Sequence, residues 1–149
     1  MVSIDIDVRE SKELLDFVNA FRRDGMKTIN NELHRIAVDV RNDILKSMRS
    51  SPAGGKTYKR GGIAHVASLP GYPPRVDRGD LWSRIFVEKG YDFSRVYTEN
   101  VIYAHWLEEG TKFMQERPFF GPAVDRSRWQ ERIRNRIIAE RFAGRRIEE

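Results

Sequence analysis

The sequence predicts an α+β domain with a small antiparallel sheet, and three patterns support this fold class. Residues 2–8 alternate apolar and acidic side chains, which is typical of a half-buried strand. Apolar residues recur at steps of three or four between residues 29 and 44, as one face of a helix requires. Residues 81–98 contain two strand-like runs joined by a short glycine-containing connection, which indicates a hairpin. At 149 residues, the chain is expected to form one domain over 1–149.

The first helical region follows the N-terminal strand. Ser11 stands where a helix N-cap belongs, and apolar residues from 14 to 21 begin the buried stripe. Asp24 and Gly25 interrupt this stripe, so the region is either one very long helix or two helices, and a break there is favoured. The helix is expected to end before Pro52, because proline disfavours helix in the residue before it.

Residues 51–80 are expected to form a long Pro/Gly loop. They contain six glycines and four prolines and show no periodic apolar pattern. Loops of this length within a compact domain tend to be functional or disordered. The hypothesis is a loop that is mobile in the free subunit and becomes ordered against a neighbour. Slow amide exchange throughout the loop of an isolated monomer would contradict it.

A short helix and a last helix are expected after the hairpin. Asn100 is the expected cap of the short helix over residues 101–109, and Gly110 is the expected residue after its end. The last helix, roughly residues 122–143, is expected to turn most of its arginines outward. Its expected buried side comprises Trp129, Ile133, Ile137 and Ile138.

The charge pattern points to an anionic partner. The net charge is +5 and the isoelectric point is about 9.7. Residues 126–149 hold eight arginines against four glutamates. A solvated helix face accounts for this excess, and contact with DNA phosphates or an acidic protein surface is the alternative. The candidate contact residues are Arg126, Arg128, Arg132, Arg134, Arg136, Arg141, Arg145 and Arg146.

Composition excludes several classes of protein. The chain has no cysteine, which excludes disulfides, a thiolate nucleophile and a cysteine zinc site. No apolar run is long enough to span a bilayer, and the N-terminal residues carry acids where a signal peptide needs cations. The protein is therefore expected to be made and kept in a cytoplasm, without a membrane partner.

Enzyme chemistry finds little support in the sequence. His105 and Glu108 lie three apart on the expected short helix, yet no third metal ligand accompanies them. Asp5 and Asp7 share one face of the first strand, but acids on the wet face of an edge strand explain them equally well. The glycines between 54 and 62 are not followed by the Gly-Lys-Ser/Thr of a phosphate-binding loop. The sequence therefore predicts no enzyme, no catalytic or metal residues and no cofactor.

Two stretches carry a family resemblance. They are ASLPGYPPRVDRGDLWSRI, over residues 67–85, and YAHWLEEGTKFMQERPFFGPA, over residues 103–123. In this order and at this distance they resemble the minor tail components of long-tailed bacteriophages and prophages. These are neck, or tail-completion, proteins related to the lambda-type tail protein Z. The matching positions are Pro70, Gly71, Pro73, Pro74, Gly79, Leu81, Tyr103, Ala104, Glu108, Gly110, Thr111, Arg117, Pro118, Phe119, Pro122 and Ala123. Arg78 departs from the family, which often has threonine there.

The resemblance implies a role in virion assembly without catalysis. Such proteins are ring subunits, expected six to a ring, where the tail tube meets the connector below the head. The implied partners are other copies of the chain, tail-tube and terminator proteins, head-connector proteins, and DNA in the lumen. The implied location is the virion neck, assembled in the host cytoplasm. Two alternatives stay open: a tail terminator that stops tube growth, and a non-specific DNA-contacting protein that uses the arginine-rich helix.

The second stretch is interpreted as a structural corner rather than a catalytic loop. Gly110 supplies the left-handed residue after a helix, and Phe119 is buried beneath the last helix by a proline-fixed turn. Arg117 is a candidate ion-pair partner of Glu108 or Glu109, which would hold the corner together.

Overall fold

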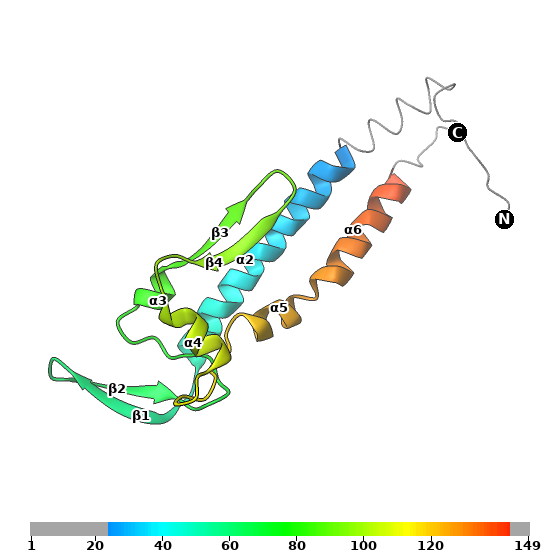
Figure 1. Ribbon diagram of the computed structural model, residues 1–149. Coiled ribbons are helices and arrows are strands. Elements are labelled where there is room, and N and C mark those ends of the chain that lie inside the picture. Colours follow the sequence, from blue (N-terminus) through cyan, green and yellow to red (C-terminus); the bar gives the residue numbers. More distant parts are fainter. Residues whose placement is uncertain (1–23, 144–149) are drawn as a thin grey trace, which may run out of the picture.

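A computed structural model describes residues 24–143 of the chain (Figure 1). The fold is α+β, as predicted: a long helix, two antiparallel two-stranded sheets, short helices and a C-terminal helix. The expected strand over residues 2–8, with Asp5 and Asp7, and the expected cap at Ser11 lie outside the described residues. So do Arg145 and Arg146.

Helix α2, Met26–Ser50, is the central element of the fold. The elements that pack against it are strands β3 (Ile85–Lys89) and β4 (Ser94–Thr98) and helices α5 (Gly121–Ser127) and α6 (Trp129–Ala143). Apart from the adjacent pair Ile36 and Ala37, its buried side chains are spaced three or four apart, as the sequence pattern requires. They are Ile36, Ala37, Val40, Ile44 and Met48. The helix ends where it was expected to end, because Ser51 is extended, with ψ 130°, before Pro52.

The start of α2 bears on the break expected at Asp24 and Gly25. These two residues form a π-type turn that leads directly into the helix. Gly25 has φ −63° and ψ −44°, which are helical values. The chain therefore does not turn away at Gly25, and any break further upstream lies outside the described residues.

Residues 53–68 form a β-hairpin, so the expected long loop is wrong for this part of the chain. Strand β1, Ala53–Arg60, pairs antiparallel with β2, Ile63–Ser68, and Tyr58 lies opposite His65. Gly61 and Gly62 join them with φ 57° and 84°. Two successive residues with positive φ make the turn that suits a twisted two-residue hairpin. Residues 69–79 then cross back to the body of the molecule.

The second hairpin was predicted correctly, apart from its first residues. Residues Asp80–Ser83 form the short helix α3, and strands β3, Ile85–Lys89, and β4, Ser94–Thr98, follow. The two strands are antiparallel and lie along α2 (Figure 1). The Arg41 Nε on α2 donates a hydrogen bond to the Ile85 carbonyl at 2.8 Å, which fixes the start of the sheet on the helix.

Helix α4, Tyr103–Glu109, follows, but Asn100 does not cap it. Asn100 has φ 53°, and the helix begins three residues later, with Ile102 in the N-cap position and no side-chain cap. The left-handed conformation of Asn100 instead turns the chain out of β4. Asparagine tolerates this conformation better than most residues.

The expected last helix is two helices. Helix α5, Gly121–Ser127, ends at Arg128, which has φ 50° and ψ 41°, and α6, Trp129–Ala143, starts beyond it. The Arg128 N–H donates to the Asp125 carbonyl and closes α5. This left-handed step directs α6 along α2 (Figure 1).

The expected buried side of the last helix is largely wrong. Ile133 packs against the edge of the core. Trp129, Ile137 and Ile138 are between 38% and 44% exposed. The core instead lies at the other end of the molecule, between α2, α3, β3, α4 and α5. Its buried side chains are Ile36, Val40, Ile44, Met48, Leu81, Ile85, Val101, Ala104, Phe119 and Ala123. Within residues 24–143, no helix is long and apolar enough to cross a membrane.

Candidate functional site

The two stretches that carry the resemblance meet in space. The Gly71 N–H donates a hydrogen bond to the Glu116 carbonyl at 2.9 Å. The Arg117 guanidinium lies 3.4 Å from the Ser68 carbonyl at the end of β2. Segments separated by some 45 residues thus form one corner, which we call the motif corner and define as residues 68–81 and 103–123.

Glu108 holds the second half of the motif corner. Its carboxylate accepts backbone hydrogen bonds from Phe119 at 2.8 Å, Phe120 at 3.0 Å and Gly121 at 2.8 Å. These are free N–H groups at the start of α5, where the helix dipole favours an anion. The end of α4 is therefore bonded to the start of α5 through one side chain.

The expected ion pair between Arg117 and Glu108 or Glu109 is wrong. Glu108 is turned towards α5, as described above, and Arg117 is turned towards β2. The Arg117 N–H also donates to the Leu107 carbonyl at 2.6 Å. Glu109 lies beside His105 on the exposed side of α4, 3.4 Å from its Nδ1.

Gly110 ends α4 in a conformation that favours glycine. Its φ of 73° and ψ of −177° lie in a region that is essentially restricted to glycine. A Cβ there would also lie 2.9 Å from the Glu116 nitrogen and 3.0 Å from the Met114 oxygen. Thr111 and Met114 exchange backbone hydrogen bonds and close the short loop that follows. The prediction that Gly110 follows the end of the helix is confirmed, but its conformation is not the left-handed helical one that was expected, because ψ is −177°.

Phe119 and Ala123 anchor the motif corner in the core. Each is 1% exposed. The ring of Phe119 packs against that of Phe120 at a centroid distance of 4.9 Å. Pro122 lies in the first turn of α5, where a fixed φ costs no hydrogen bond. The burial of Phe119 by a proline-fixed turn is as predicted.

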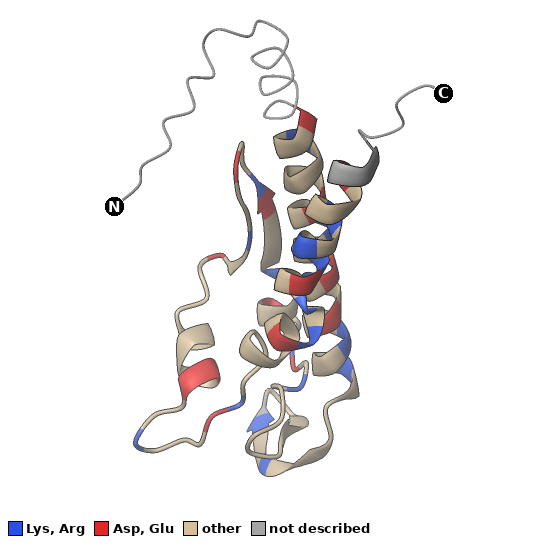
Figure 2. Ribbon diagram, turned by 90° about the vertical axis from the view of Figure 1, so that its right-hand side faces the viewer, with Lys and Arg blue, Asp and Glu red and all other residues tan. Residues whose placement is uncertain are grey.

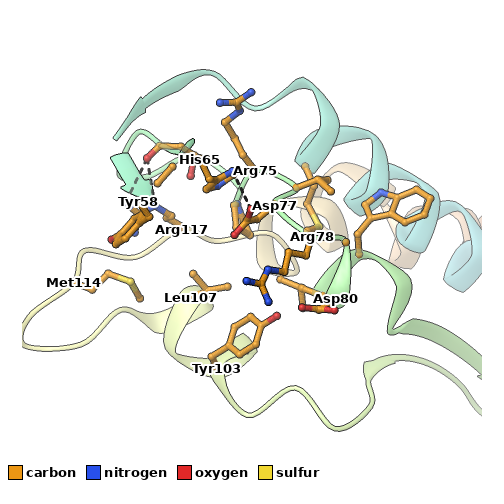
Figure 3. A pocket seen from close by; sticks show the side chains of 18 residues that line it. Tyr58, His65, Arg75, Asp77, Arg78, Asp80, Tyr103, Leu107, Met114 and Arg117 are labelled. Atoms are coloured by element: carbon orange, nitrogen blue, oxygen red, sulfur yellow. Dashed lines mark hydrogen bonds and ion pairs between the residues drawn. The ribbon is translucent and has the colours of Figure 1, made fainter. Parts of the chain in front are cut away.

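A cavity of about 450 Å³ opens beside the motif corner (Figure 3). Its apolar wall includes Met48, Leu81 and Leu107. Its charged rim comprises Arg75, Asp77, Arg78, Asp80 and Arg117. His65 and Tyr58 come from the β1–β2 hairpin, and Tyr103 comes from α4. The cavity therefore gathers residues from both halves of the motif corner and from the hairpin that the sequence did not reveal.

Contacts within the rim fix several of these groups. The His65 Nδ1 lies 3.5 Å from an Asp77 carboxylate oxygen, and Arg75 donates to the Val66 carbonyl at 2.9 Å. Ser68, 1% exposed, lines the cavity, and its Oγ has no hydrogen-bond partner among the residues described. Buried hydroxyl groups are normally paired, so this one indicates where a ligand group could bind.

The structure does not join His105 to Glu108 as metal ligands, because Glu108 faces the start of α5. Across residues 24–143, no three histidine or carboxylate side chains are grouped as a metal site would need. The glycines between 54 and 62 belong to a β-hairpin and its turn.

Most of the described arginines on α5 and α6 pair with carboxylates. Figure 2 marks the basic and acidic positions along the ribbon of these helices and of α2. Arg132 lies 2.8 Å from Asp39 and 2.9 Å from Glu32, both on α2. The hydrogen bond that Arg132 donates to Asp39, and then the one that it donates to Glu32, raise the pKa of Arg132, although burial acts against them. Arg126 lies 2.6 Å from Asp43, one turn further along α2. These arginines were expected to point outward, and the structure turns them towards α2.

The remaining arginines of the last region are placed differently. Arg128 pairs with Glu131, and Arg136 lies 3.5 Å from Glu140. Arg134 is exposed and has no ion-pair partner within the described part of the chain. Most of the described arginines that were candidates for DNA contact are thus already paired with acids of this chain.

Comparison with known proteins adds no identification. No protein-family model, no curated protein and no solved structure matches the chain.

Sequence reasoning missed the cavity because it missed the β1–β2 hairpin. His65, Ser68 and Arg75 meet only when the chain reverses at Gly61 and Gly62. A Gly-Gly pair between two runs containing threonine, tyrosine, isoleucine and valine is a hairpin signal and could have revealed it.

Proposed function

We propose that this chain is a structural morphogenesis protein of a long-tailed bacteriophage or prophage. In this proposal it is a ring subunit at the head–tail interface that completes the tail and joins it to the connector. The proposal starts from the resemblance of residues 67–85 and 103–123 to neck and tail-completion proteins.

The observation that carries the proposal is the architecture of the motif corner. The two stretches were compared as sequence alone, yet they lie in contact through Gly71 and Glu116. Gly110 allows a close approach of the backbone at residues 114 and 116. Glu108 accepts a hydrogen bond from the Phe119 N–H, and the Phe119 side chain is buried in the core. The motif residues therefore act by stabilising the local backbone fold. This role suits a structural protein that contacts neighbouring subunits, and it requires no catalytic chemistry.

The position of the hairpin also favours assembly. Strands β1 and β2 extend away from the body of the molecule (Figure 1). Each strand pairs only with the other among the described residues. Arg75 and Arg117 donate to the Val66 and Ser68 carbonyls of β2, so the outer edge of β1 is the more open one. An extended element with an open edge can reach a neighbouring subunit, and a ring subunit needs two distinct contact surfaces.

The proposal is tested by electron microscopy of particles from a lysate in which this gene carries an early stop codon. Filled heads beside separate tails of normal length are the expected result. Tails of irregular length would favour the tail-terminator alternative. Intact, infectious particles would overturn an assembly role of either kind.

Contact with DNA is a second candidate, and the distribution of unpaired charge favours the β1–β2 hairpin over the arginine-rich helix for it. Residues 51–76 contain basic residues and no acid. Lys56 and Lys59, both exposed, lie on β1. The arginines of α5 and α6 are mostly paired with carboxylates. A polyanion would therefore find more unpaired positive charge on the hairpin.

A further inference from the structure

The turn between β3 and β4 presents an aromatic ring and a carboxylate at one end of the molecule. Tyr91 is 92% exposed, more than any other large hydrophobic side chain described, and Asp92 beside it is exposed as well. We call these two residues the turn knob. In Figures 1 and 2 this turn lies at the end of the sheet furthest from α3 and the β1–β2 hairpin.

The turn knob is held firmly in place. The Asn30 Nδ2 on α2 donates to the carbonyl oxygens of Gly90 and Tyr91, at 3.1 and 2.6 Å. The Gly90 N–H donates to the Phe93 carbonyl at 2.8 Å. Phe93 packs so closely that a Cβ at Gly90 would overlap its ring. These contacts fix the backbone of the turn before binding, which reduces the entropy that binding costs, so this turn is suited to insertion.

The cavity beside the motif corner lies at the other end of the molecule and has the shape to receive a ring. Its volume of about 450 Å³ falls in the range of small-molecule sites, and Met48, Leu81 and Leu107 give it an apolar wall. A phenol ring fits in such a space.

The polar groups of the cavity also suit a tyrosine. The Oγ of Ser68 and the Nε1 of Trp82 are buried and have no hydrogen-bond partner within the described residues. Both residues line the cavity. A buried polar group without a partner is costly, and a phenol hydroxyl can both donate and accept. A phenol hydroxyl in the cavity would pair with the Ser68 hydroxyl once the Ser68 side chain rotates towards it.

The charges around the cavity also favour a tyrosine that is followed by a carboxylate. The rim has three arginines and two aspartates, which leaves a positive excess. Arg78 extends over the cavity beside Asp80 and Tyr103 (Figure 3). No hydrogen bond or ion pair engages the Arg78 side chain among the residues described. A ligand with a carboxylate next to its ring, as in the turn knob, would meet this guanidinium.

We propose that the cavity binds the turn knob of a second copy of this chain. The ring of Tyr91 lies against the apolar wall with its hydroxyl near Ser68, and Asp92 pairs with Arg78. Since the two surfaces lie at opposite ends of the subunit, the contact is head-to-tail, and repetition closes a ring or extends a filament. The inference rests on the proposed function, which requires such contacts, and it names the surfaces that make them.

Thiol crosslinking tests this contact, because the chain has no cysteine of its own. Two variants, Asp92→Cys and Arg78→Cys, are mixed at high protein concentration and treated with a short bismaleimide. One variant carries a mass tag, so mixed and like-with-like dimers can be distinguished. The expected result is a mixed dimer that forms several-fold faster than either like-with-like dimer.

Two controls make the outcome decisive. Arg134→Cys places a thiol on α6, on an exposed residue outside the cavity, and should show no preference for Asp92→Cys. Adding Tyr91→Ala to Asp92→Cys should remove the preference, because the apolar anchor is lost. Tyr91 is exposed, so this change should leave the fold intact. An absent preference, or one that survives Tyr91→Ala, would overturn the proposed contact.

Electron microscopy of mutant particles distinguishes a failure of this inference from a failure of the proposed function. A gene with Tyr91→Ala should give separated heads and tails, as the stop codon should. If the stop codon separates heads from tails but Tyr91→Ala particles are intact, the contact is wrong and the assembly role stands. If the stop codon has no effect, the assembly role falls, and crosslinking still decides whether the two copies meet as described.

Discussion

Glu108 acts as a cap for a helix to which it does not belong. Helix α5 has no side-chain cap of its own, and Phe120 occupies its N-cap position. The carboxylate of Glu108 replaces that cap and serves three N–H groups rather than the usual one or two. The carboxylate also carries the negative charge that the positive end of the α5 dipole favours.

Replacing Glu108 should therefore destabilise the domain. Glu108→Ala is expected to lower the free energy of unfolding by about 1–2 kcal/mol, the usual range for a lost helix cap. Glu108→Gln, which keeps an oxygen acceptor but loses the charge, should fall between this variant and the wild type. Urea unfolding followed by circular dichroism measures all three. Glu109→Ala is the matched control, because Glu109 is exposed and pairs only at the surface. Equal losses at 108 and 109 would contradict the capping role.

Alanine substitutions at Gly110 and Gly62 distinguish the cost of backbone strain from the cost of steric overlap. Both glycines have positive φ, but a Cβ at Gly62 would meet nothing within 4 Å, whereas at Gly110 it would press on backbone atoms of residues 114 and 116. Gly62→Ala is expected to cost about 1 kcal/mol. Gly110→Ala should cost clearly more, because its backbone region is almost closed to alanine. Thermal unfolding would reveal the order, and a reversed order would contradict this account of the motif corner.

Residue roles at the motif corner could be partly predicted from the sequence. Gly110 and Phe119 follow from local rules, because a helix-ending glycine and a proline-fixed turn act on their neighbours in the chain. The partner of Glu108 could not be predicted in this way. It depends on how α4 and α5 approach each other, and a guanidinium and three backbone N–H groups are both reasonable partners for a carboxylate.

At the scale of elements, α6 is attached to α2 by charge more than by apolar packing. Arg132 lies between Glu32 and Asp39, and Arg126 lies beside Asp43. Among the side chains of α6 that the structure describes, that of Ile133 packs against the core. An attachment of this kind is sensitive to salt, since partly exposed ion pairs are screened.

Removing the Arg132 charge should weaken this attachment at low salt. Arg132→Met keeps much of the apolar stem and is expected to lower the free energy of unfolding by about 1 kcal/mol, the upper end for partly exposed ion pairs. In about 1 M salt, where screening acts within a few ångströms, the difference should shrink. Arg134→Met on the same helix is the control and should have little effect. Urea unfolding at both salt concentrations measures it, and a salt-independent loss would point to packing instead.

The two hairpins should differ in local stability. Strands β3 and β4 lie on α2, whereas β1 and β2 extend from the body and are held chiefly at their base. Native-state amide exchange is therefore expected to be faster in residues 56–66 than in residues 85–98. Uniformly slow exchange in both would contradict this, and it would also remove the idea that a neighbour orders the first hairpin.

Helices and strands could be predicted where the apolar periodicity extended over many residues. They could not be predicted where one or two residues changed the direction of the chain. Helix α2 repeats its apolar spacing over several turns, so its course and its end before Pro52 could be anticipated. The break at Arg128 could not, because no glycine or proline marks it and its left-handed conformation is imposed by the packing of α6 on α2. The β1–β2 hairpin was overlooked because its strands are short of large apolar residues.

At the scale of the whole molecule, the positively charged residues fall into two groups: arginines that are paired with carboxylates, and lysines of the β1–β2 hairpin that have no such partner within residues 24–143. The arginines of α5 and α6 are largely balanced by acids of α2 and of their own helix. The hairpin is basic and has no acid nearby in sequence. Net charge alone could not reveal this division, because pairing depends on which surfaces the fold brings together.

Any non-specific affinity for duplex DNA should therefore reside in the hairpin. The variants Lys56→Ala/Lys59→Ala and Arg126→Ala/Arg136→Ala each remove two positive charges. The first pair is expected to weaken binding several-fold at low salt and to flatten its dependence on salt, because free cations release counterions from phosphates. The second pair should have less effect, because the guanidinium groups of Arg126 and Arg136 are already engaged by carboxylates and are less free to contact phosphates. Fluorescence anisotropy with a labelled duplex at two salt concentrations measures both. A larger loss from the second pair would return the DNA-contacting role to the arginine-rich helix, and no binding at low salt would end that alternative.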